Sequence, residues 1–129
     1  ERTLLGNQGG FTLIEIIAVL IILGILAAVA IPRFMNLTAD AQQRAMDGAV
    51  AAAFSNATLS YSRFVLRNNT APTGITANAW TGTGSSVTIE TDLGDYNVTS
   101  YSYTAGNPPT VTITVTGQGS TSTGTFNLP

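Results

Sequence analysis

The run GGFTLIEIIAVLIILGILAAVAIP, residues 9–32, decides how the rest of this sequence must be arranged. From Phe11 to Ile31 there are 21 residues, and Glu15 carries the only charge among them. At a rise of about 1.5 Å per residue, a helix over this run is about 32 Å long, enough to cross a bilayer. A carboxylate inside such a span costs about 3 kcal/mol on insertion scales. The sequence therefore predicts a membrane-length helix whose one acidic residue needs a compensating partner.

A second helical pattern follows Pro32 without a break. Apolar side chains recur every three or four residues from Phe34 to Phe64, and polar residues occupy most of the other positions. The helix should end near Arg67, because helix-breaking residues crowd positions 68–74. We expect one helix over about residues 12–67. Its first half is apolar all round and protrudes, and its second half packs an apolar stripe, beginning at Phe34, on a sheet.

The last third of the chain has the alternating pattern of strands. Four runs, residues 87–91, 96–104, 110–116 and 121–128, are rich in Thr, Val, Ile and Tyr. In TVTITVT, residues 110–116, the side chains of Val111, Ile113 and Val115 fall on one face and the threonines on the other. Short turns between the runs favour an antiparallel sheet of about four strands. The predicted fold class is α+β, with the long N-terminal helix covering this sheet through its second half.

Composition removes most enzyme chemistries. The 129-residue chain contains no Cys and no His, so it lacks thiolate and imidazole metal ligands, disulfides and any Ser-His or Cys-His catalytic pair. Charged residues make up 9% of the chain and the net charge is −2, which argues against nucleic acid as a partner. We predict no cofactor, no metal centre and no enzymatic activity, and the length suits one domain.

Glu15 admits two interpretations. An acidic residue near a helix start interacts favourably with the helix macrodipole, but by only about 0.3–1 kcal/mol, which is less than the insertion cost. The other interpretation is a cationic partner inside the apolar environment. No basic side chain lies between Arg2 and Arg33. Cleavage after Gly10 would create a cation, the new α-amino group of Phe11, and we favour this second interpretation.

A resemblance to the processing site of type IV pilins and the related pseudopilins rests on Gly10-Phe11-Thr12-Leu13-Ile14-Glu15. In that family a prepilin peptidase cuts after the glycine, and the newly exposed residue, here Phe11, is N-methylated. The resemblance implies that Glu15 is the assembly residue, which meets the Phe11 amine of a neighbouring subunit. It also implies that Gly24 and Pro32 weaken the helix.

The same resemblance implies four segments. Residues 1–10 form a leader, residues 11–32 a transmembrane and filament-core helix, residues 33–68 an amphipathic half-helix, and residues 69–129 a loop and sheet domain. The implied function is that of a structural subunit, which polymerises with itself into a helical extracellular filament for adhesion, surface attachment or motility. The implied partners are the prepilin peptidase, the pilus assembly machinery and the inner membrane, which holds the precursor before assembly.

The residues after Pro32 are similar to those of pilins of the mannose-sensitive haemagglutinin type. This finer similarity rests on Pro32-Arg33-Phe34-Met35-Asn36-Leu37 and on Asp40-Ala41. Two features differ from the family pattern. Asn7-Gln8-Gly9 stand where a basic residue is usual, and a C-terminal disulfide loop is impossible without Cys.

Two other functions stay open on the sequence alone. A pseudopilin of a type II secretion system is expected to carry a calcium loop near its C-terminus, for which Glu90, Asp92 and Asp95 are a weak candidate. A solvated turn fits these residues better. A minor tip pilin or adhesin would bind through its sheet, with Trp80 as the best contact. We favour the major pilin of a type IV pilus over both.

Overall fold

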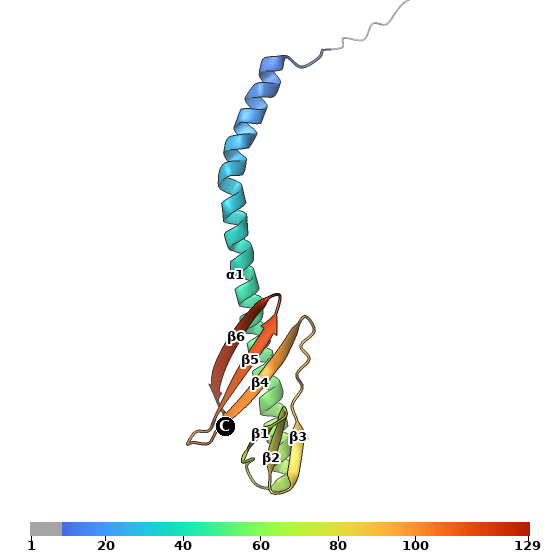
Figure 1. The fold of residues 1–129 in the computed structure, drawn as a ribbon, viewed down its shortest axis with the longest axis vertical. Coiled ribbons are helices and arrows are strands. Elements are labelled where there is room, and N and C mark those ends of the chain that lie inside the picture. Colours follow the sequence, from blue (N-terminus) through green and yellow to red (C-terminus); the bar gives the residue numbers. More distant parts are fainter. Residues whose placement is uncertain (1–8) are drawn as a thin grey trace, which may run out of the picture. The chain divides into compact units, whose positions relative to one another are not determined.

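The computed structural model describes residues 9–129, so residues 1–8 of the expected leader lie outside the described part. One helix is followed by strands that build two antiparallel sheets (Figure 1). The elements are α1 (Leu13–Asn68), β1 (Gly74–Thr76), β2 (Ala79–Gly82), β3 (Ser85–Thr88), β4 (Tyr96–Thr104), β5 (Thr110–Gly117) and β6 (Ser120–Asn127). The α+β class predicted from the sequence is confirmed.

Both ends of α1 lie within one residue of the predicted bounds. At the C-terminal end, Asn69 adopts a positive φ of 53°, and its N–H donates to the carbonyl of Val65 at 2.7 Å. Asn is one of the few residues that tolerate this left-handed conformation, which satisfies a free carbonyl of the last helical turn. The first residue after α1 therefore ends the helix.

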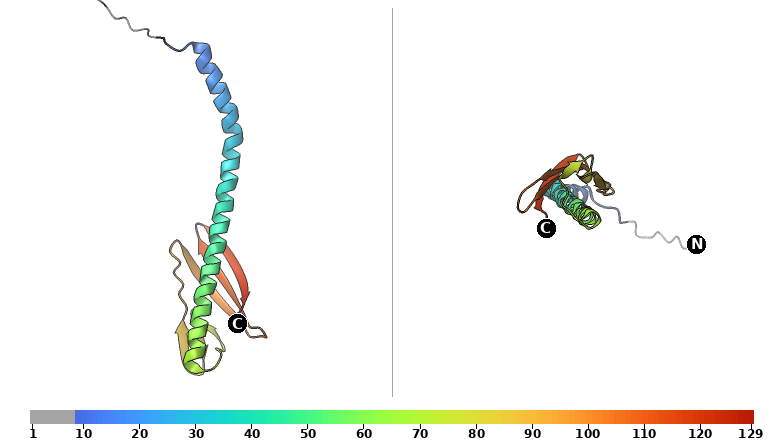
Figure 2. Two further views of the ribbon diagram at one scale, coloured as in Figure 1. Left: turned by 180° about the vertical axis from the view of Figure 1, so that it is seen from behind. Right: turned by 90° about the horizontal axis from the view of Figure 1, so that it is seen from below.

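The chain divides into two compact units, one up to Asp40 and one from Ala41 to Pro129. Within the second unit, α1 runs along one face of the sheets (Figure 2). It buries a single stripe of side chains there, at the spacing of three and four residues that one helix face requires. The stripe consists of Met46, Ala49, Val50, Ala53, Ala57, Ser60, Tyr61 and Phe64.

The prediction that this stripe begins at Phe34 is wrong. Phe34 is 71% exposed and Leu37 is 65% exposed, and the first buried helical residue is Met46. The covered stretch reaches from Val50, which lies close to Gly124 of β6, to Phe64, which lies close to Gly82 of β2, so the two sheets together set its length. Apolar spacing thus indicated the correct face of the helix but not the length over which strands cover it.

The strands form two three-stranded sheets, β1-β2-β3 and β4-β5-β6, in place of the single sheet of about four strands that we expected. The four predicted runs correspond to β3, β4, β5 and β6, and β1 and β2 were missed. These two strands have only three and four residues and lie in a Gly- and Thr-rich stretch. Strands this short carry too few alternating positions to be recognised from sequence.

Each sheet contains a tight two-residue hairpin. Thr83 and Gly84 connect β2 to β3, and Gln118 and Gly119 connect β5 to β6, with positive φ at all four residues. Two consecutive residues with positive φ make a type I′ turn, whose twist matches that of antiparallel strands. Gly119, with a φ of 77°, takes this conformation without the steric cost that a side chain would bring.

The core of the second unit lies between α1 and the sheets. Val111, Ile113 and Val115 of β5 are fully buried, as their alternation predicts. Trp80 of β2 is also fully buried, and its indole N–H donates to the carbonyl of Ala57 on α1 at 3.0 Å. The Trp80 ring makes edge-on contacts with Tyr61 and Tyr103. An indole that packs on α1 and β4 and also satisfies its N–H fixes β2 against the helix.

Candidate functional site

The predicted cleavage point lies just before the helix. Residues 9–12 have no helical or strand conformation and are exposed, and Phe11 is 85% exposed. Apart from Gly10 itself and its two neighbours in the chain, no residue has an atom within 4 Å of the position that a Cβ would occupy at Gly10. Proteases bind extended and accessible chain more readily than chain inside a helix. The peptide bond between Gly10 and Phe11 therefore has the local structure that cleavage requires.

Thr12 and Glu15 cap the start of α1 reciprocally. The backbone N–H of Thr12 donates to Oε2 of Glu15 at 2.7 Å, and the backbone N–H of Glu15 is directed at Oγ1 of Thr12 at 3.4 Å. The first N–H groups of a helix have no partner within the helix, and this arrangement, the capping box, satisfies two of them. Glu15 therefore has a hydrogen-bond partner in its own chain.

Thr12 is the functional-site residue that the sequence-based prediction missed. The signal was present, because Thr12 and Glu15 have the T-x-x-E spacing of a capping box directly before an apolar run. The prediction weighed the helix macrodipole and a cationic partner for Glu15, and it overlooked a hydrogen bond from a main-chain donor. The predicted pairing of Glu15 with the Phe11 amine of a neighbouring subunit involves a second copy and stays a prediction.

The apolar segment after the cap is fully uncovered in the described chain. Every residue from Gly9 to Ala45 is exposed. The most apolar 18-residue window of α1 has a mean hydropathy of 3.0, and none of it is buried. By length and composition, α1 is long and apolar enough to cross a membrane. An apolar surface of this extent needs lipid or other protein around it.

Gly24 and Pro32, the predicted helix-weakening residues, both lie inside α1. Proline has no N–H, so the helical hydrogen bond from residue 32 to the carbonyl of Ala28 cannot form. Glycine raises the conformational cost of a helix by about 1 kcal/mol relative to alanine. The helix continues through both positions, and their role as points of weakness stays a prediction.

Two of the three acidic residues considered for calcium accept hydrogen bonds from main-chain donors. Glu90 Oε1 accepts from the N–H groups of Thr91 and Asp92, both at 3.1 Å, and Asp92 Oδ1 accepts from the Gly94 N–H at 2.9 Å. Residues 9–129 contain no group of three acidic side chains placed to hold a metal ion together. Glu90 and Asp92 thus shape the turn before β4.

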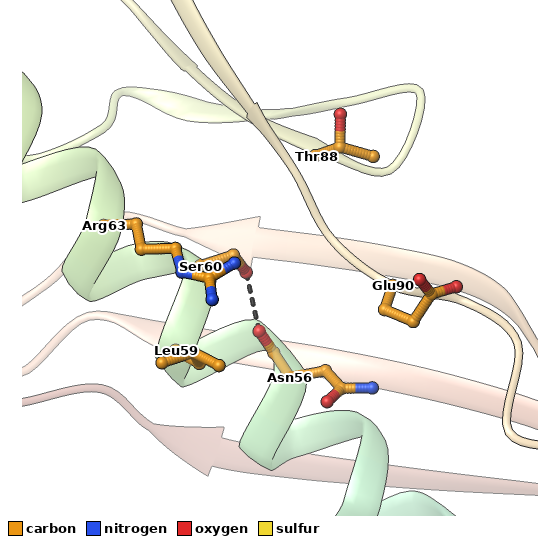
Figure 3. Close-up of a pocket in the computed structure, with 6 residues that line it drawn as sticks. All are labelled: Asn56, Leu59, Ser60, Arg63, Thr88 and Glu90. Carbon is orange, nitrogen blue, oxygen red and sulfur yellow. Dashed lines mark hydrogen bonds between the residues drawn. The ribbon is translucent and has the colours of Figure 1, made fainter.

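A cavity of about 170 Å³ lies between α1 and the segment around β3 (Figure 3). Arg63 and Glu90 come from its two sides, and the Ser60 hydroxyl at its base donates to the Asn56 carbonyl at 2.7 Å. Trp80, the residue considered as an adhesin contact, has no exposed surface. Trp80 is therefore a packing anchor and not a binding residue of the isolated chain.

Comparison with known proteins agrees with this site. The prokaryotic N-terminal methylation motif matches residues 5–31. The type IV narrow pilus major component PilA5 of Thermus thermophilus is 54% identical over 43 residues, and the match covers 33% of this chain and 37% of that protein. The chain therefore aligns with little more than a third of this relative. Among solved structures, none matches the chain significantly.

The fold and the N-terminal segment define a class, the proteins that carry a methylation motif on a long apolar helix joined to a small sheet domain. The methylation motif and the PilA5 similarity each cover only part of the chain, and over that part the chain is similar to type IV pilins, as its sequence indicated.

Proposed function

We propose that this chain is the major structural subunit of a type IV pilus, which polymerises into a helical extracellular filament. The observation that carries the proposal is the exposed Gly10-Phe11 bond followed directly by a capped, uncovered apolar helix. Before assembly, the apolar part of α1 lies in the inner membrane, where lipid covers it. In the filament, the same surface is covered by the helices of neighbouring subunits, which replaces one apolar environment by another.

Glu15 changes its partner during this transfer. In the single chain its carboxylate accepts the Thr12 N–H. After cleavage, the α-amino group of Phe11 on a neighbouring subunit offers a full positive charge in the same apolar environment. Charge-assisted hydrogen bonds are roughly twice as strong as neutral ones, so the new pairing favours the filament and fixes the axial register of the incoming subunit.

The contact between Glu15 of one subunit and Phe11 of the next joins two different surfaces. Such heterologous contacts, when they do not close into a ring, build open helical polymers. The segment between Gly24 and Pro32 provides a place where the helix can yield, because it is bounded by a residue of low helix propensity and one without an N–H. Local unwinding there would lengthen the subunit under tension.

The pilus function has more support than the two alternatives. A tip adhesin that binds through Trp80 requires an accessible indole, and this indole is buried under Tyr61 and Tyr103. A secretion pseudopilin that holds calcium through Glu90, Asp92 and Asp95 requires free carboxylate oxygens. Oxygens of Glu90 and Asp92 accept main-chain N–H groups instead.

Processing tests the proposal directly. Filament protein sheared from cells should have an intact mass that corresponds to a chain starting at Phe11 with one added methyl group. Gly10→Leu should block cleavage and leave the precursor in the membrane. Gly9→Leu is the matched control, because both glycines are exposed, non-helical and free of neighbours within 4 Å. Filaments built from uncleaved chains would refute the proposal.

A further inference from the structure

The cavity between α1 and the segment around β3 has polar side chains on both of its sides (Figure 3). On α1, Asn56, Ser60 and Arg63 are four and three residues apart, which places their side chains on one face of the helix. Ser60 is only 4% exposed, and its hydroxyl donates to the carbonyl of Asn56 at 2.7 Å. Because its own helix satisfies this hydroxyl, Asn56 and Arg63 provide the polar side chains that α1 offers to a ligand.

Ile89, the residue after β3, holds the opposite side of the cavity in place. It is fully buried, and its N–H donates to the carbonyl of Asn78 at 2.8 Å. Along an extended segment, neighbouring side chains point to opposite faces, so Thr88 and Glu90 point away from the core that Ile89 enters. Both are exposed and line the cavity. One buried residue thus directs two polar neighbours toward the cavity.

The carboxylate of Glu90 is held in position by its own chain. Oε1 accepts from the N–H groups of Thr91 and Asp92, both at 3.1 Å. The main-chain carbonyl of Glu90 accepts from the hydroxyl of Tyr101 at 2.9 Å, which fixes the backbone as well. Both main-chain donors bind Oε1, so Oε2 keeps its capacity as an acceptor. A carboxylate that is already fixed loses little conformational entropy when a ligand binds to it.

Arg63 and Glu90 carry opposite charges but are not hydrogen-bonded to each other. They come from opposite sides of the cavity, and the one hydrogen bond that joins any of the six lining residues is that of Ser60 with Asn56 (Figure 3). A guanidinium only donates hydrogen bonds, and a carboxylate only accepts them. A ligand that fills the cavity must therefore offer an acceptor on one side and a donor on the other.

A neutral sugar ring meets this requirement. Each of its hydroxyls is both a donor and an acceptor, so one edge of the ring can accept from Arg63 while the other donates to Glu90. The side chain of Leu59, which is 53% exposed at the cavity, offers an apolar surface to the C–H groups of the ring. The cavity volume of about 170 Å³ suits one ring, since sites for larger, drug-sized ligands have about 300–1,000 Å³.

Other small polar ligands fit the cavity less well. Arg63 and Glu90 are the two charged residues among the six that line it, so their charges cancel and give no net attraction to a simple anion or cation. A free amino acid carries both a donor and an acceptor, but a single carbon separates its ammonium from its carboxylate. Such a ligand cannot span two groups on opposite sides of the cavity as a ring with hydroxyls on several carbons can.

We propose that this cavity binds one pyranose unit of a neutral glycan. Arg63 and Glu90 bind hydroxyls on opposite edges of the ring, and Leu59 contacts its C–H groups. The amide of Asn56, which both donates and accepts, binds a further hydroxyl. All of these residues lie in the unit from Ala41 to Pro129 of a single chain. The inference therefore does not depend on the proposed function, and it does not involve the buried Trp80.

The test is a titration of the full chain with sugars, followed by amide signals in NMR spectra. The chain is held in dodecylphosphocholine micelles, because this detergent has no sugar group that could compete. The probes are the methyl glycosides of glucose, galactose, mannose and N-acetylglucosamine, each raised into the millimolar range. At least one of them should shift the amide signals of Ser60, Arg63 and Glu90 in a saturable way.

Two variants remove the charged contacts one at a time. Arg63→Met keeps an unbranched side chain without the guanidinium, and Glu90→Gln keeps an oxygen that can accept the main-chain N–H groups. Each should raise the dissociation constant of the bound glycoside about ten-fold or more, because a hydrogen bond to a charged group is lost. Arg67→Met and Asp95→Asn are the matched controls. Both residues are exposed and lie nearby in the chain but outside the cavity lining, so binding should not change.

The outcomes that overturn the proposal are separate from any result on cleavage or filaments. It is overturned if none of the four glycosides shifts these signals, or if both cavity variants bind as tightly as the unmodified chain. Free serine, titrated in parallel, tests the zwitterionic alternative, and a shift with serine but with no glycoside also overturns it. So does an equal loss of binding in Arg67→Met and Arg63→Met, because the contact would then lie on the outer surface of α1.

Discussion

At the scale of single residues, the carboxylate of Glu15 caps α1 in the structure, and we propose that it also acts in filament assembly. Its bond to the Thr12 N–H organises the first turn of α1, and capping of this kind stabilises helices by about 0.5–2 kcal/mol. The same carboxylate is the only charge in the apolar run, which the cap alone does not explain, because Gln serves as well as Glu in a capping box. Glutamine therefore separates the two uses.

We predict that Glu15→Gln keeps the cap and loses assembly. The amide oxygen of Gln can accept the Thr12 N–H, but it cannot pair with an amine as an ion. Filament yield should fall almost as far as with Glu15→Ala, while the precursor persists in the membrane. Immunoblots of sheared filaments measure the filament yield, and immunoblots of membrane fractions measure the amount of precursor. Asp40→Asn is the control, an exposed carboxylate on the same helix whose loss should leave filaments at the wild-type level. A normal filament yield from Glu15→Gln would show that Glu15 serves only as a helix cap.

Tyr101 makes stability depend on alkaline pH. Its hydroxyl donates to the Glu90 carbonyl at 2.9 Å, and burial, helped by the nearby Glu90 charge, raises the pKa of Tyr101 to about 12. In the unfolded chain the pKa of tyrosine is about 10. Between about pH 10 and 12 the unfolded chain therefore binds fewer protons than the folded chain, and the free energy of unfolding should fall as pH rises.

Tyr101→Phe should flatten this dependence. Urea unfolding at several pH values from 9 to about 12 measures the slope, and the residual slope should come from Tyr103, whose pKa is also raised by burial. Below pH 10 the variant should lose only the hydrogen bond, worth about 1 kcal/mol. An unchanged slope in the variant would mean that Tyr101 ionises in the folded chain as readily as in the unfolded one.

At the scale of elements, Trp80 joins the small sheet β1-β2-β3 to α1. Two strands of this sheet have only four residues and one has three, and such short strands have little stability of their own. The buried indole and its bond to the Ala57 carbonyl provide the attachment. The stability of the sheet should therefore depend largely on this one side chain.

We predict that Trp80→Ala lowers the free energy of unfolding by about 3–5 kcal/mol, the usual cost of removing a large buried aromatic side chain. Trp80→Phe should cost less, because the ring keeps most of its packing but leaves the carbonyl contact unmade. Leu66→Ala is the control, since Leu66 is 85% exposed and should change stability by about 0.5 kcal/mol or less. Thermal unfolding, monitored by circular dichroism, measures the stability of the three variants. Equal losses at Trp80 and Leu66 would contradict the anchoring role.

At the scale of the whole molecule, burial is confined to one of the two units. All buried side chains in residues 9–129 lie between Met46 and Leu128, within the unit from Ala41 to Pro129. The residues up to Asp40 expose an apolar surface that is suited to lipid or to other subunits. The chain therefore combines a unit with its own core and a segment whose partner comes from outside the chain.

We predict that a fragment of residues 41–129 folds cooperatively without detergent. It retains every buried contact of the core and loses only residues that are exposed in the single chain. A single sigmoidal thermal transition by circular dichroism, close to that of the full chain in detergent, is the expected result. Aggregation or a gradual transition would show that residues before Ala41 stabilise the unit.

The sequence by itself determined the helix, the fold class and the N-terminal methylation motif. The apolar run is long enough that local pattern alone predicts a helix, and the breakers after Arg67 end it within one residue of the prediction. The strands with clear alternation, β4 and β5, were also predicted at nearly their observed bounds. The motif from Gly10-Phe11 to Glu15 indicates type IV pilins through residue types and spacing alone, because cleavage and capping depend on local chain.

The tertiary structure decided what depends on contacts between distant residues. It set the start of the buried stripe at Met46, because burial depends on where strands lie and not on apolar spacing. It revealed β1 and β2, which are too short to be recognised from their own sequence and of which β2 contacts α1 through the Trp80 indole. It gave Glu15 a main-chain partner and left β6 with an open edge, since hydrogen-bond partners follow from three-dimensional neighbours, which a pattern of residue types does not contain.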